Sequence, residues 1–170
     1  MDNRSRRIGV LMPPGNVTCE REFSHYVPRG CSVHFSRLYR KTVSVDKEGL
    51  LSMIQSAETG SKALAQSDVE VILYACTSGS FLSGPGREDE LGERIQALTG
   101  IPGITTSTAV IRALKALRAG RVYMITPYPD DVNVEEVSFL THRDIEVPGW
   151  DAFRCPLSED IRRKIGRAHV

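Results

Sequence analysis

Apolar and polar residues alternate along the first half of the chain in blocks that predict strands joined by helices. The apolar runs Arg7–Met12 and Cys31–Tyr39 predict strands, the second through its period of two. Between Asp46 and Gln66 the apolar residues recur at helical spacing, interrupted by Gly60, which predicts a crossover helix to a third strand. This order predicts an α/β fold with a parallel sheet.

The predicted third strand carries the most informative chemistry. The stretch from Val69 to Phe81, V-E-V-I-L-Y-A-C-T-S-G-S-F, has the continuous apolar character of a strand buried on both faces and leads to Cys76. Ligands of doubly wound sheets bind at the carboxyl ends of the strands, so this thiol and the hydroxyls of Thr77 and Ser78 face the expected site. Most strand cysteines, however, are inert core residues.

Two further polar candidates lie near the same edge of the sheet. The first strand ends at Pro13–Gly15, after which Asn16 or Thr18 caps a helix to about Tyr26. The Asn16 amide is either only a cap or a group that meets a carboxylate. Arg37 lies near the crevice end of the second strand and could attract an acidic substrate, although a solvated or paired arginine is the commoner outcome.

The segment after the third strand is predicted to begin as a loop. Ser78–Gly86 has the composition of a glycine-rich loop, but no G-K-[ST] follows, which disfavours a phosphate loop. Helices are predicted over about Arg87–Leu98 and from an N-cap at Ser107 to Gly120.

The chain then repeats its opening pattern. Arg121 begins R-V-Y-M-I-T-P-Y-P-D-D-V-N, which matches R-I-G-V-L-M-P-P-G-N-V-T-C from Arg7 at an offset of 114 residues (121 minus 7). We expect residues 1–120 to form one complete half of a three-layer α/β sandwich and residues 121–163 to begin a second, pseudo-symmetric half. A counterpart of Cys76 would fall near position 190 (76 plus 114), beyond the chain.

The last seven residues have an unusual sequence. Residues 164–170, K-I-G-R-A-H-V, match the in-frame translation of a common sequencing adapter, so we expect a non-native tail and a natural chain that continues past about Arg163. We expect these 170 residues alone to be inactive and marginally stable, with an exposed sheet edge that favours association into a homo-oligomer.

Composition narrows the classes of partner. The formal net charge of +1, from 22 basic and 21 acidic residues, gives no reason to expect nucleic acid or a membrane as partner. The first apolar run is too short for a signal peptide or a membrane span. Cys19, Cys31, Cys76 and Cys155 form no C-x-x-C pair and the histidines are scattered, so neither a metal site nor a disulfide framework is predicted and the cytoplasm is the expected compartment.

Three motifs in this order resemble the aspartate/glutamate racemase superfamily, and within it the branch of maleate cis-trans isomerase and arylmalonate decarboxylase. They are Pro13-Pro14-Gly15-Asn16, Tyr74-Ala75-Cys76-Thr77-Ser78 and Thr126-Pro127-Tyr128. The resemblance spans about residues 7–150 and implies two similar α/β halves with the active site between them.

The resemblance also implies roles for single residues. It makes Cys76 the first-half catalytic cysteine and Asn16 a contact of a substrate carboxylate, and it places Thr77, Ser78 and Tyr128 in the carboxylate or oxyanion pocket. These residue types suit carbanion chemistry beside a carboxylate, because fixed hydroxyl and N–H donors meet the developing negative charge. A polar pocket or a helix terminus is expected to lower the pKa of the thiol, which then acts as base or nucleophile.

The implied activity is a cofactor-independent isomerase of a small dicarboxylate, similar to maleate cis-trans isomerase, which needs neither a metal nor an organic cofactor. The decarboxylase branch has glycine where this chain has Cys76, which favours isomerase or racemase chemistry. The second catalytic cysteine of the family falls beyond this chain, and Cys155 is too early to replace it. A racemase, an arylmalonate decarboxylase and a non-catalytic carboxylate-binding module remain alternatives, and the sequence does not choose the substrate.

Overall fold

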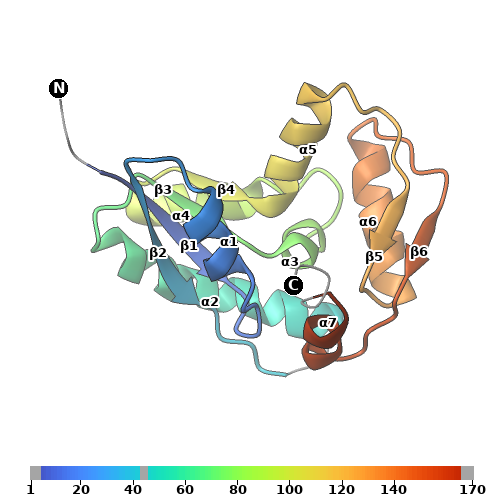
Figure 1. Cartoon of the computed structure of the whole chain (residues 1–170), viewed down its shortest axis with the longest axis horizontal. Coiled ribbons are helices and arrows are strands. Elements are labelled where there is room, and N and C mark those ends of the chain that lie inside the picture. Colours follow the sequence, from blue (N-terminus) through green and yellow to red (C-terminus); the bar gives the residue numbers. More distant parts are fainter. Residues whose placement is uncertain (1–4, 43–45, 166–170) are drawn as a thin grey trace.

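The computed structural model describes residues 5–42 and 46–165, which form two parallel sheets flanked by helices (Figure 1). The larger sheet has the order β2-β1-β3-β4, and the smaller one pairs β5 with β6. The strands are β1 (Arg6–Met12), β2 (Cys31–Arg37), β3 (Val71–Tyr74), β4 (Gly103–Thr105), β5 (Met124–Thr126) and β6 (Trp150–Ala152). The helices are α1 (Cys19–Tyr26), α2 (Lys47–Ala65), α3 (Thr77–Phe81), α4 (Glu90–Thr99), α5 (Thr106–Ala116), α6 (Asp130–His142) and α7 (Ser158–Ile165).

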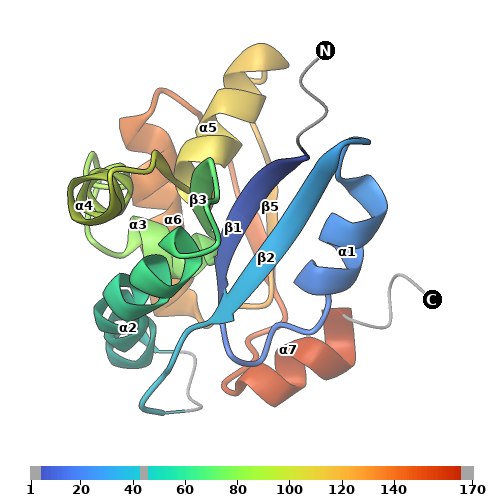
Figure 2. The same cartoon turned by 90° about the vertical axis from the view of Figure 1, so that its left-hand side faces the viewer.

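The alternation of side chains along β1 divides them between two helical layers. Val10 and Met12 cluster with Cys19 of α1, whereas Leu11 belongs to the main core together with Met53 of α2. Figure 2 shows α1 and α2 on opposite sides of the sheet. The predicted three-layer α/β architecture with a parallel sheet is therefore confirmed.

Gly60 explains how closely α2 packs on that sheet. A Cβ at this position would lie 2.7 Å from Leu11 Cδ2 and 3.0 Å from Ser36 Oγ, so any side chain there would require these side chains or the helix to shift. The helix itself starts as predicted, because the Asp46 side chain accepts a hydrogen bond of 2.7 Å from the Gly49 N–H. No helix within the described ranges is long and apolar enough to cross a membrane.

The segment β5-α6-β6 repeats the parallel strand-helix-strand order of β1-α1-β2. Arg7 pairs with Ser32 across β1 and β2. Arg121 and Glu146 form a bridge, and they lie 114 residues after Arg7 and Ser32, respectively. The strand pairs beyond that bridge shift by one residue, since Met124 pairs with Trp150. The division into residues 1–120 and 121–163 stays a prediction. Of the tail expected to be non-native, residues 164 and 165 continue α7, and residues 166–170 lie outside the described ranges.

The predicted loop Ser78–Gly86 is wrong in its first part. β3 ends at Tyr74 and α3 starts directly after Cys76. Tertiary packing outweighs the low helix propensity of this glycine- and serine-rich segment, because Phe81 is buried and stacks on Phe139 of α6 with ring centroids 5.9 Å apart.

The boundaries of the next two helices also differ from those predicted. α4 begins at Glu90 rather than near Arg87. Arg87 lies before the helix, and its guanidinium pairs with the carboxylate of Glu90. The N-cap of α5 is Thr105 rather than Ser107: the Thr105 hydroxyl accepts a hydrogen bond of 3.2 Å from the Thr108 N–H. Ser107 is used differently, because its hydroxyl bonds that of Ser80 in α3 at 2.5 Å.

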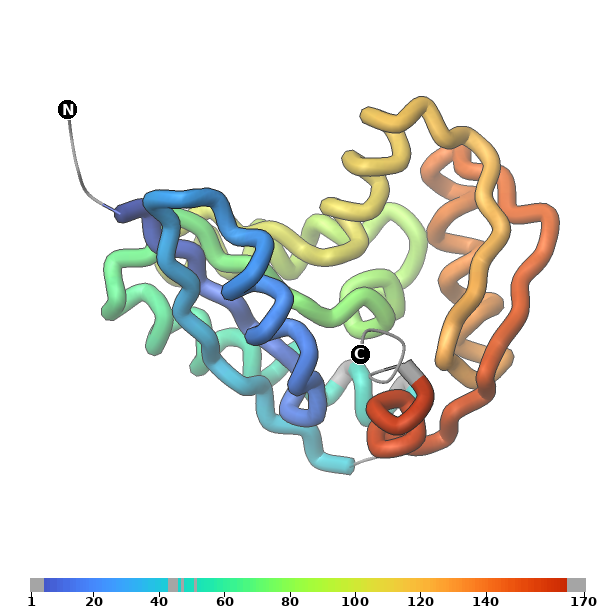
Figure 3. Tube along the Cα trace, in the orientation of Figure 1, coloured from blue at the N-terminus to red at the C-terminus, as the bar shows by residue number. Residues whose placement is uncertain are grey.

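The last helix packs against segments that are distant from it in the sequence. Figure 3 shows α7 beside the loop after β1 and the segment that leads into α2. Two hydrogen bonds span these distances: Arg40 donates to Ser158 across 118 positions, and Arg162 donates to the Gly15 carbonyl across 147. This placement makes α7 one wall of the cavity described next.

Candidate active site

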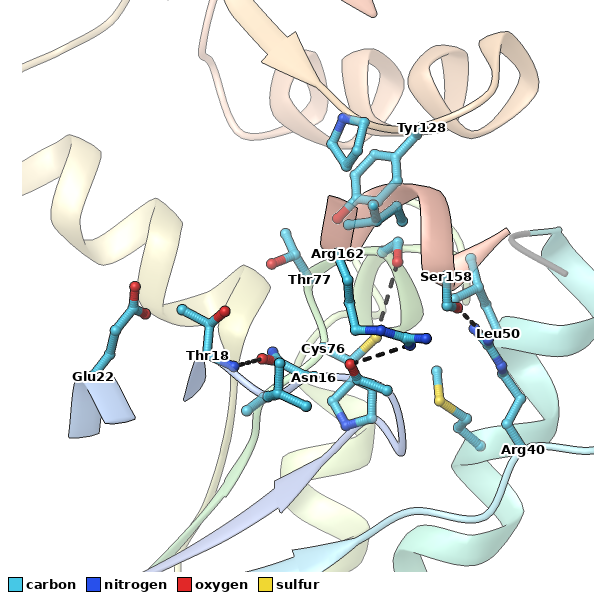
Figure 4. A pocket seen from close by; sticks show the side chains of 18 residues that line it. Asn16, Thr18, Glu22, Arg40, Leu50, Cys76, Thr77, Tyr128, Ser158 and Arg162 are labelled. Carbon is cyan, nitrogen blue, oxygen red and sulfur yellow. Dashed lines mark hydrogen bonds between the residues drawn. The ribbon is translucent and has the colours of Figure 1, made fainter. Parts of the chain in front are cut away.

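A cavity of about 330 Å³ lies where the carboxyl ends of β1 and β3 meet α7 and the loop after β5 (Figure 4). All five residues assigned to the site from the sequence line this cavity, so the structure brings them together; their individual roles stay predictions. The lining residues are Pro13, Gly15, Asn16, Val17, Thr18, Glu22, Arg40, Leu50, Met53, Ala75, Cys76, Thr77, Ser78, Pro127, Tyr128, Ser158, Ile161 and Arg162.

Cys76 lies at the floor of the cavity, between the end of β3 and the start of α3. Its side chain is 7% exposed, and its Sγ lies 3.9 Å from the Ser78 hydroxyl. Burial raises the pKa of the Cys76 thiol, while the Gly79 N–H, the Ser78 hydroxyl and the Arg40 charge act in the opposite direction. The expected lowering of the pKa is thus not found in this structure, because burial outweighs the donors.

The peptide between Thr77 and Ser78 is held in one orientation. The Thr77 carbonyl accepts a hydrogen bond from the Ser80 hydroxyl at 2.8 Å, and the Ser107 hydroxyl, 3.3 Å from the same carbonyl, donates its one proton either to this carbonyl or to the Ser80 oxygen. In a planar trans peptide the following N–H points away from that carbonyl, so these bonds also fix the direction of the Ser78 N–H. The segment after the thiol is therefore pre-organised to present donors.

Asn16 has the capping role that the sequence offered as one of two interpretations, and its contact with a carboxylate stays a prediction. Its Oδ1 accepts hydrogen bonds from the N–H groups of Thr18 at 3.1 Å and Cys19 at 3.0 Å, so it caps α1. Because the amide oxygen accepts both bonds, the NH₂ group of the same side chain is left as a hydrogen-bond donor, and Asn16 lines the cavity (Figure 4). A capping side chain is held rigidly, which suits a group that is to meet a carboxylate.

Arg37 has the structural role that the sequence left as the commoner outcome. Its Nη2 pairs with the Glu20 carboxylate at 2.5 Å, and its Nη1 donates to the carbonyls of Pro14 at 3.1 Å and Asn16 at 3.2 Å. It is not among the residues that line the cavity. Arg37 therefore holds the loop that carries Asn16.

Tyr128 enters the cavity from the loop after β5. Its backbone is fixed on both sides, since its N–H donates to the Thr126 hydroxyl at 3.2 Å and its carbonyl accepts from Asn133 Nδ2 at 3.1 Å. Burial raises the pKa of the Tyr128 hydroxyl, and the charges of Glu136 and Cys76 raise it further. The phenol consequently remains protonated and can donate to an anion.

Two arginines of the cavity were missed from the sequence. Arg40 follows β2, donates to the Thr42 carbonyl at 2.7 Å, and bonds Ser158. Arg162 extends from α7 toward Cys76 (Figure 4), and its guanidinium donates a hydrogen bond to the Gly15 carbonyl at 3.5 Å. Nothing in the sequence separates them from the other basic residues, since only the fold brings them to the thiol. Because Glu22 is the single carboxylate among the described residues of the lining, the cavity favours an anionic ligand.

Glu136 of α6 is a second group that the sequence did not single out. Burial raises its pKa from 4.5 to about 7, and its Oε2 has no hydrogen-bond partner within the part of the chain that the structure describes. No three His, Cys, Asp or Glu side chains of that part are grouped as a metal ion would require.

The raised pKa of Glu136 predicts a pH-dependent stability. The carboxyl group is protonated in both folded and unfolded protein below about pH 4.5, and the penalty for burying its charge develops as the pH rises to about 7. Between these two pH values, the free energy of unfolding of the wild-type protein should fall by up to about 3 kcal/mol relative to that of Glu136→Gln. Urea unfolding of both proteins from pH 4 to 8 measures the difference, and Glu93→Gln, at an exposed glutamate of α4, is the control. Parallel stability profiles for wild type and Glu136→Gln would contradict the assignment.

Comparison with known proteins places this cavity in context. The sequence model of the arylmalonate decarboxylase family matches residues 8–163. A maleate isomerase of Nocardia farcinica is 33% identical over 166 residues, which cover 92% of this chain and 65% of that protein. An arylmalonate decarboxylase of Bordetella bronchiseptica is 34% identical over 142 residues, covering 84% of this chain and 58% of that protein. The chain thus spans less than two thirds of the length of these curated relatives.

Solved structures agree with the sequence comparisons. A cysteine-to-serine mutant of the Nocardia farcinica maleate cis-trans isomerase, with a covalently bound succinylcysteine intermediate, has a TM-score of 0.82 at 25% identity and matches 97% of this chain and 73% of its own. A double mutant of arylmalonate decarboxylase, with glycine replaced by cysteine and cysteine by serine, has a TM-score of 0.83 in its liganded form at 29% identity, covering 93% of this chain and 66% of that chain.

Proposed function

Because the chain belongs to the arylmalonate decarboxylase family, we propose that the whole protein is a cofactor-independent, cysteine-based isomerase of small dicarboxylates, of the maleate cis-trans isomerase type. The observation that carries the proposal is the position of Cys76 at the floor of a cavity lined by two arginines and by the donors Asn16 and Tyr128. The maleate isomerases among the relatives and the succinylcysteine of one solved structure support it.

The proposed reaction needs no redox partner. The Cys76 thiolate adds to one alkene carbon of maleate, and the π electron pair moves to the neighbouring carbon, where the adjacent carboxylate delocalises it as an enediolate. The bond between the two carbons is now single and rotates. When the electron pair returns, the C–S bond breaks, and fumarate leaves with the thiolate regenerated. The Ser78 N–H, the Tyr128 hydroxyl and the Asn16 amide are the donors available to the enediolate.

The arginines favour isomerisation over decarboxylation. A carboxylate that leaves as CO₂ loses its charge, so a guanidinium beside it stabilises the ground state more than the transition state. Isomerisation keeps both carboxylates charged throughout, and a cationic wall does not oppose it. Arg40 and Arg162 line the cavity together with Cys76, and this supports a substrate that keeps two carboxylates. Amino-acid racemase chemistry and arylmalonate decarboxylation remain the alternative reactions.

Anion attraction by Arg162 can be measured without turnover. The measured quantity is the rate of Cys76 alkylation by anionic iodoacetate divided by the rate with neutral iodoacetamide. We expect this ratio to be about fivefold lower in Arg162→Gln than in wild type, which corresponds to the loss of about 1 kcal/mol of Coulomb attraction. Site-resolved mass spectrometry gives both rates. Arg163→Gln removes the same charge one residue away, outside the cavity lining, where Arg163 pairs with Glu159 at 2.5 Å; its ratio should be nearly unchanged. Equal ratios for the two variants would contradict the role of Arg162.

The competing class is a non-catalytic carboxylate-binding module. The whole protein, incubated with maleate, aspartate and arylmalonates in the presence of a chelator, decides between the classes. Fumarate formed from maleate, detected by NMR, supports the isomerase, whereas saturable maleate binding without any product supports the module. We further propose that the ligand is a small carboxylate and that the protein self-associates as a homo-oligomer. We also propose the cytoplasm as its compartment, because the four cysteines are unpaired in the structure and the cytoplasm keeps thiols reduced.

A further inference from the structure

We infer that Tyr74 is a positioning residue for the nucleophile, and that its buried hydroxyl donates a hydrogen bond to the Cys76 thiolate from beneath the cavity. The inference rests on the role of Cys76 in the proposed function. Tyr74 opens the Tyr74–Ser78 motif, but the sequence assigns it no role, since it is the last residue of β3 and lies within an apolar run as a core aromatic residue would.

The first observation is an unpaired polar atom in the core. The Tyr74 side chain is 0% exposed, and its hydroxyl has no hydrogen-bond partner among the described residues. Burying a hydroxyl without a partner costs about 1–3 kcal/mol, and phenylalanine would fill almost the same space without that cost. A buried, unpaired hydroxyl therefore calls for an explanation other than packing.

The second observation is where that hydroxyl points. A Cβ built on Gly79 of α3 would lie 2.6 Å from the Tyr74 hydroxyl oxygen and 3.1 Å from Cys76 Sγ. The oxygen and the sulfur thus approach the same point on the helix, and only a residue without a side chain leaves the space between them open. The glycine of the A-C-T-S-G segment is explained by this convergence.

The chemistry of the two groups suits a bond that forms when the thiol ionises. A neutral thiol is a weak acceptor, whereas a thiolate accepts strong hydrogen bonds from neutral donors. Burial raises the pKa of Tyr74, with the neighbouring Cys76 as a further cause, so the phenol keeps its proton beside the anion. In return the Tyr74 hydroxyl lowers the pKa of Cys76, as do the Gly79 N–H and the Ser78 hydroxyl. Three donors would then surround the sulfur.

Other charged or titratable groups near the sulfur come from separate elements. Arg40 follows β2, Arg162 belongs to α7, Glu22 belongs to α1, and Tyr128 follows β5. All four line the open cavity, whereas Tyr74 does not and approaches from the core. Removing the Tyr74 hydroxyl therefore changes one donor and leaves the charges around the cavity in place.

The test is the ionisation of Cys76 in Tyr74→Phe, measured in the whole protein without substrate. The pH dependence of Cys76 carbamidomethylation by iodoacetamide, resolved by peptide mass spectrometry, gives the apparent pKa. We expect the apparent pKa of Cys76 to rise by about one unit in Tyr74→Phe. The rate of carbamidomethylation near neutral pH should then be three- to tenfold lower, because less thiolate is present, although each thiolate is more nucleophilic. Tyr26→Phe, at an exposed tyrosine of α1, is the control and should leave the profile unchanged.

Stability provides the second readout. If the hydroxyl has no partner while the thiol is neutral, Tyr74→Phe should be at least as stable as wild type in urea below neutral pH. A variant that is less stable or fails to fold would reveal a structural partner for the hydroxyl and overturn the inference, as would an unchanged pKa of Cys76. Because neither readout uses turnover, a raised pKa in a protein that fails to isomerise maleate would refute the proposed function alone.

Discussion

Replacing Cys76 with serine is expected to lower the turnover of maleate by the whole protein at least about a thousandfold. Serine preserves the size of the side chain, but an alcohol is not ionised near neutral pH and cannot add to the alkene at a useful rate. The rate of fumarate formation under saturating maleate measures the effect. Binding should persist, because the carboxylate donors and the two arginines are unchanged in the variant.

Cys31→Ser is the matched control for this experiment. Cys31 is partly exposed on β2 and does not line the cavity, so its replacement should leave turnover within about twofold. Cys19 is a poor rival for the nucleophile, because burial, followed by the charges of Glu22 and Glu20, raises its pKa to about 11. Turnover by Cys76→Ser within about tenfold of wild type would refute the assigned chemistry, since the barrier would then differ by only about 1.4 kcal/mol.

The part of the site that could be predicted from the sequence is the part fixed by local chemistry. Proline and glycine after β1 force a loop, and a parallel sheet brings the ends of β1 and β3 to one edge, so Asn16 and Cys76 were expected to meet. The repeated strand and loop placed Tyr128 in an equivalent position. Backbone rules indicated where these residues lie, whereas their roles in the site were implied by the resemblance to the racemase superfamily.

The remainder depends on contacts that no local pattern encodes. Arg162 reaches the cavity because α7 packs beside a loop 147 residues earlier in the chain. The helix α3 forms in a segment of glycine and serine because Phe81 stacks on Phe139, a contact between elements far apart in sequence. The unpaired hydroxyl of Tyr74 becomes visible only once the positions of Gly79 and Cys76 are known.

The largest effect on stability is expected from Arg143→Met, which should lower the free energy of unfolding by about 3–5 kcal/mol. Arg143 follows α6 and pairs with Glu88, in the segment before α4; the Glu88 side chain is 1% exposed and that of Arg143 is 30% exposed. Arg143 also lies 3.6 Å from the Asp89 carboxylate. Removing the guanidinium leaves a charge buried without a partner, which is more costly than losing the pair as a whole.

A double-mutant cycle separates that cost from a general loss of packing. Adding Glu88→Gln to Arg143→Met removes the unpaired charge, so the double variant should recover a substantial part of the lost stability in urea unfolding. Arg121→Met is the control, because the Arg121–Glu146 pair is exposed, with 67% and 63% of the side chains accessible, and should cost less than about 1 kcal/mol. If Arg143→Met and Arg121→Met destabilise the protein equally, the Glu88 carboxylate must reach water or another cation once Arg143 is gone. The contact between the segment before α4 and the end of α6 would then rest on apolar packing such as Phe81 against Phe139 rather than on the buried ion pair.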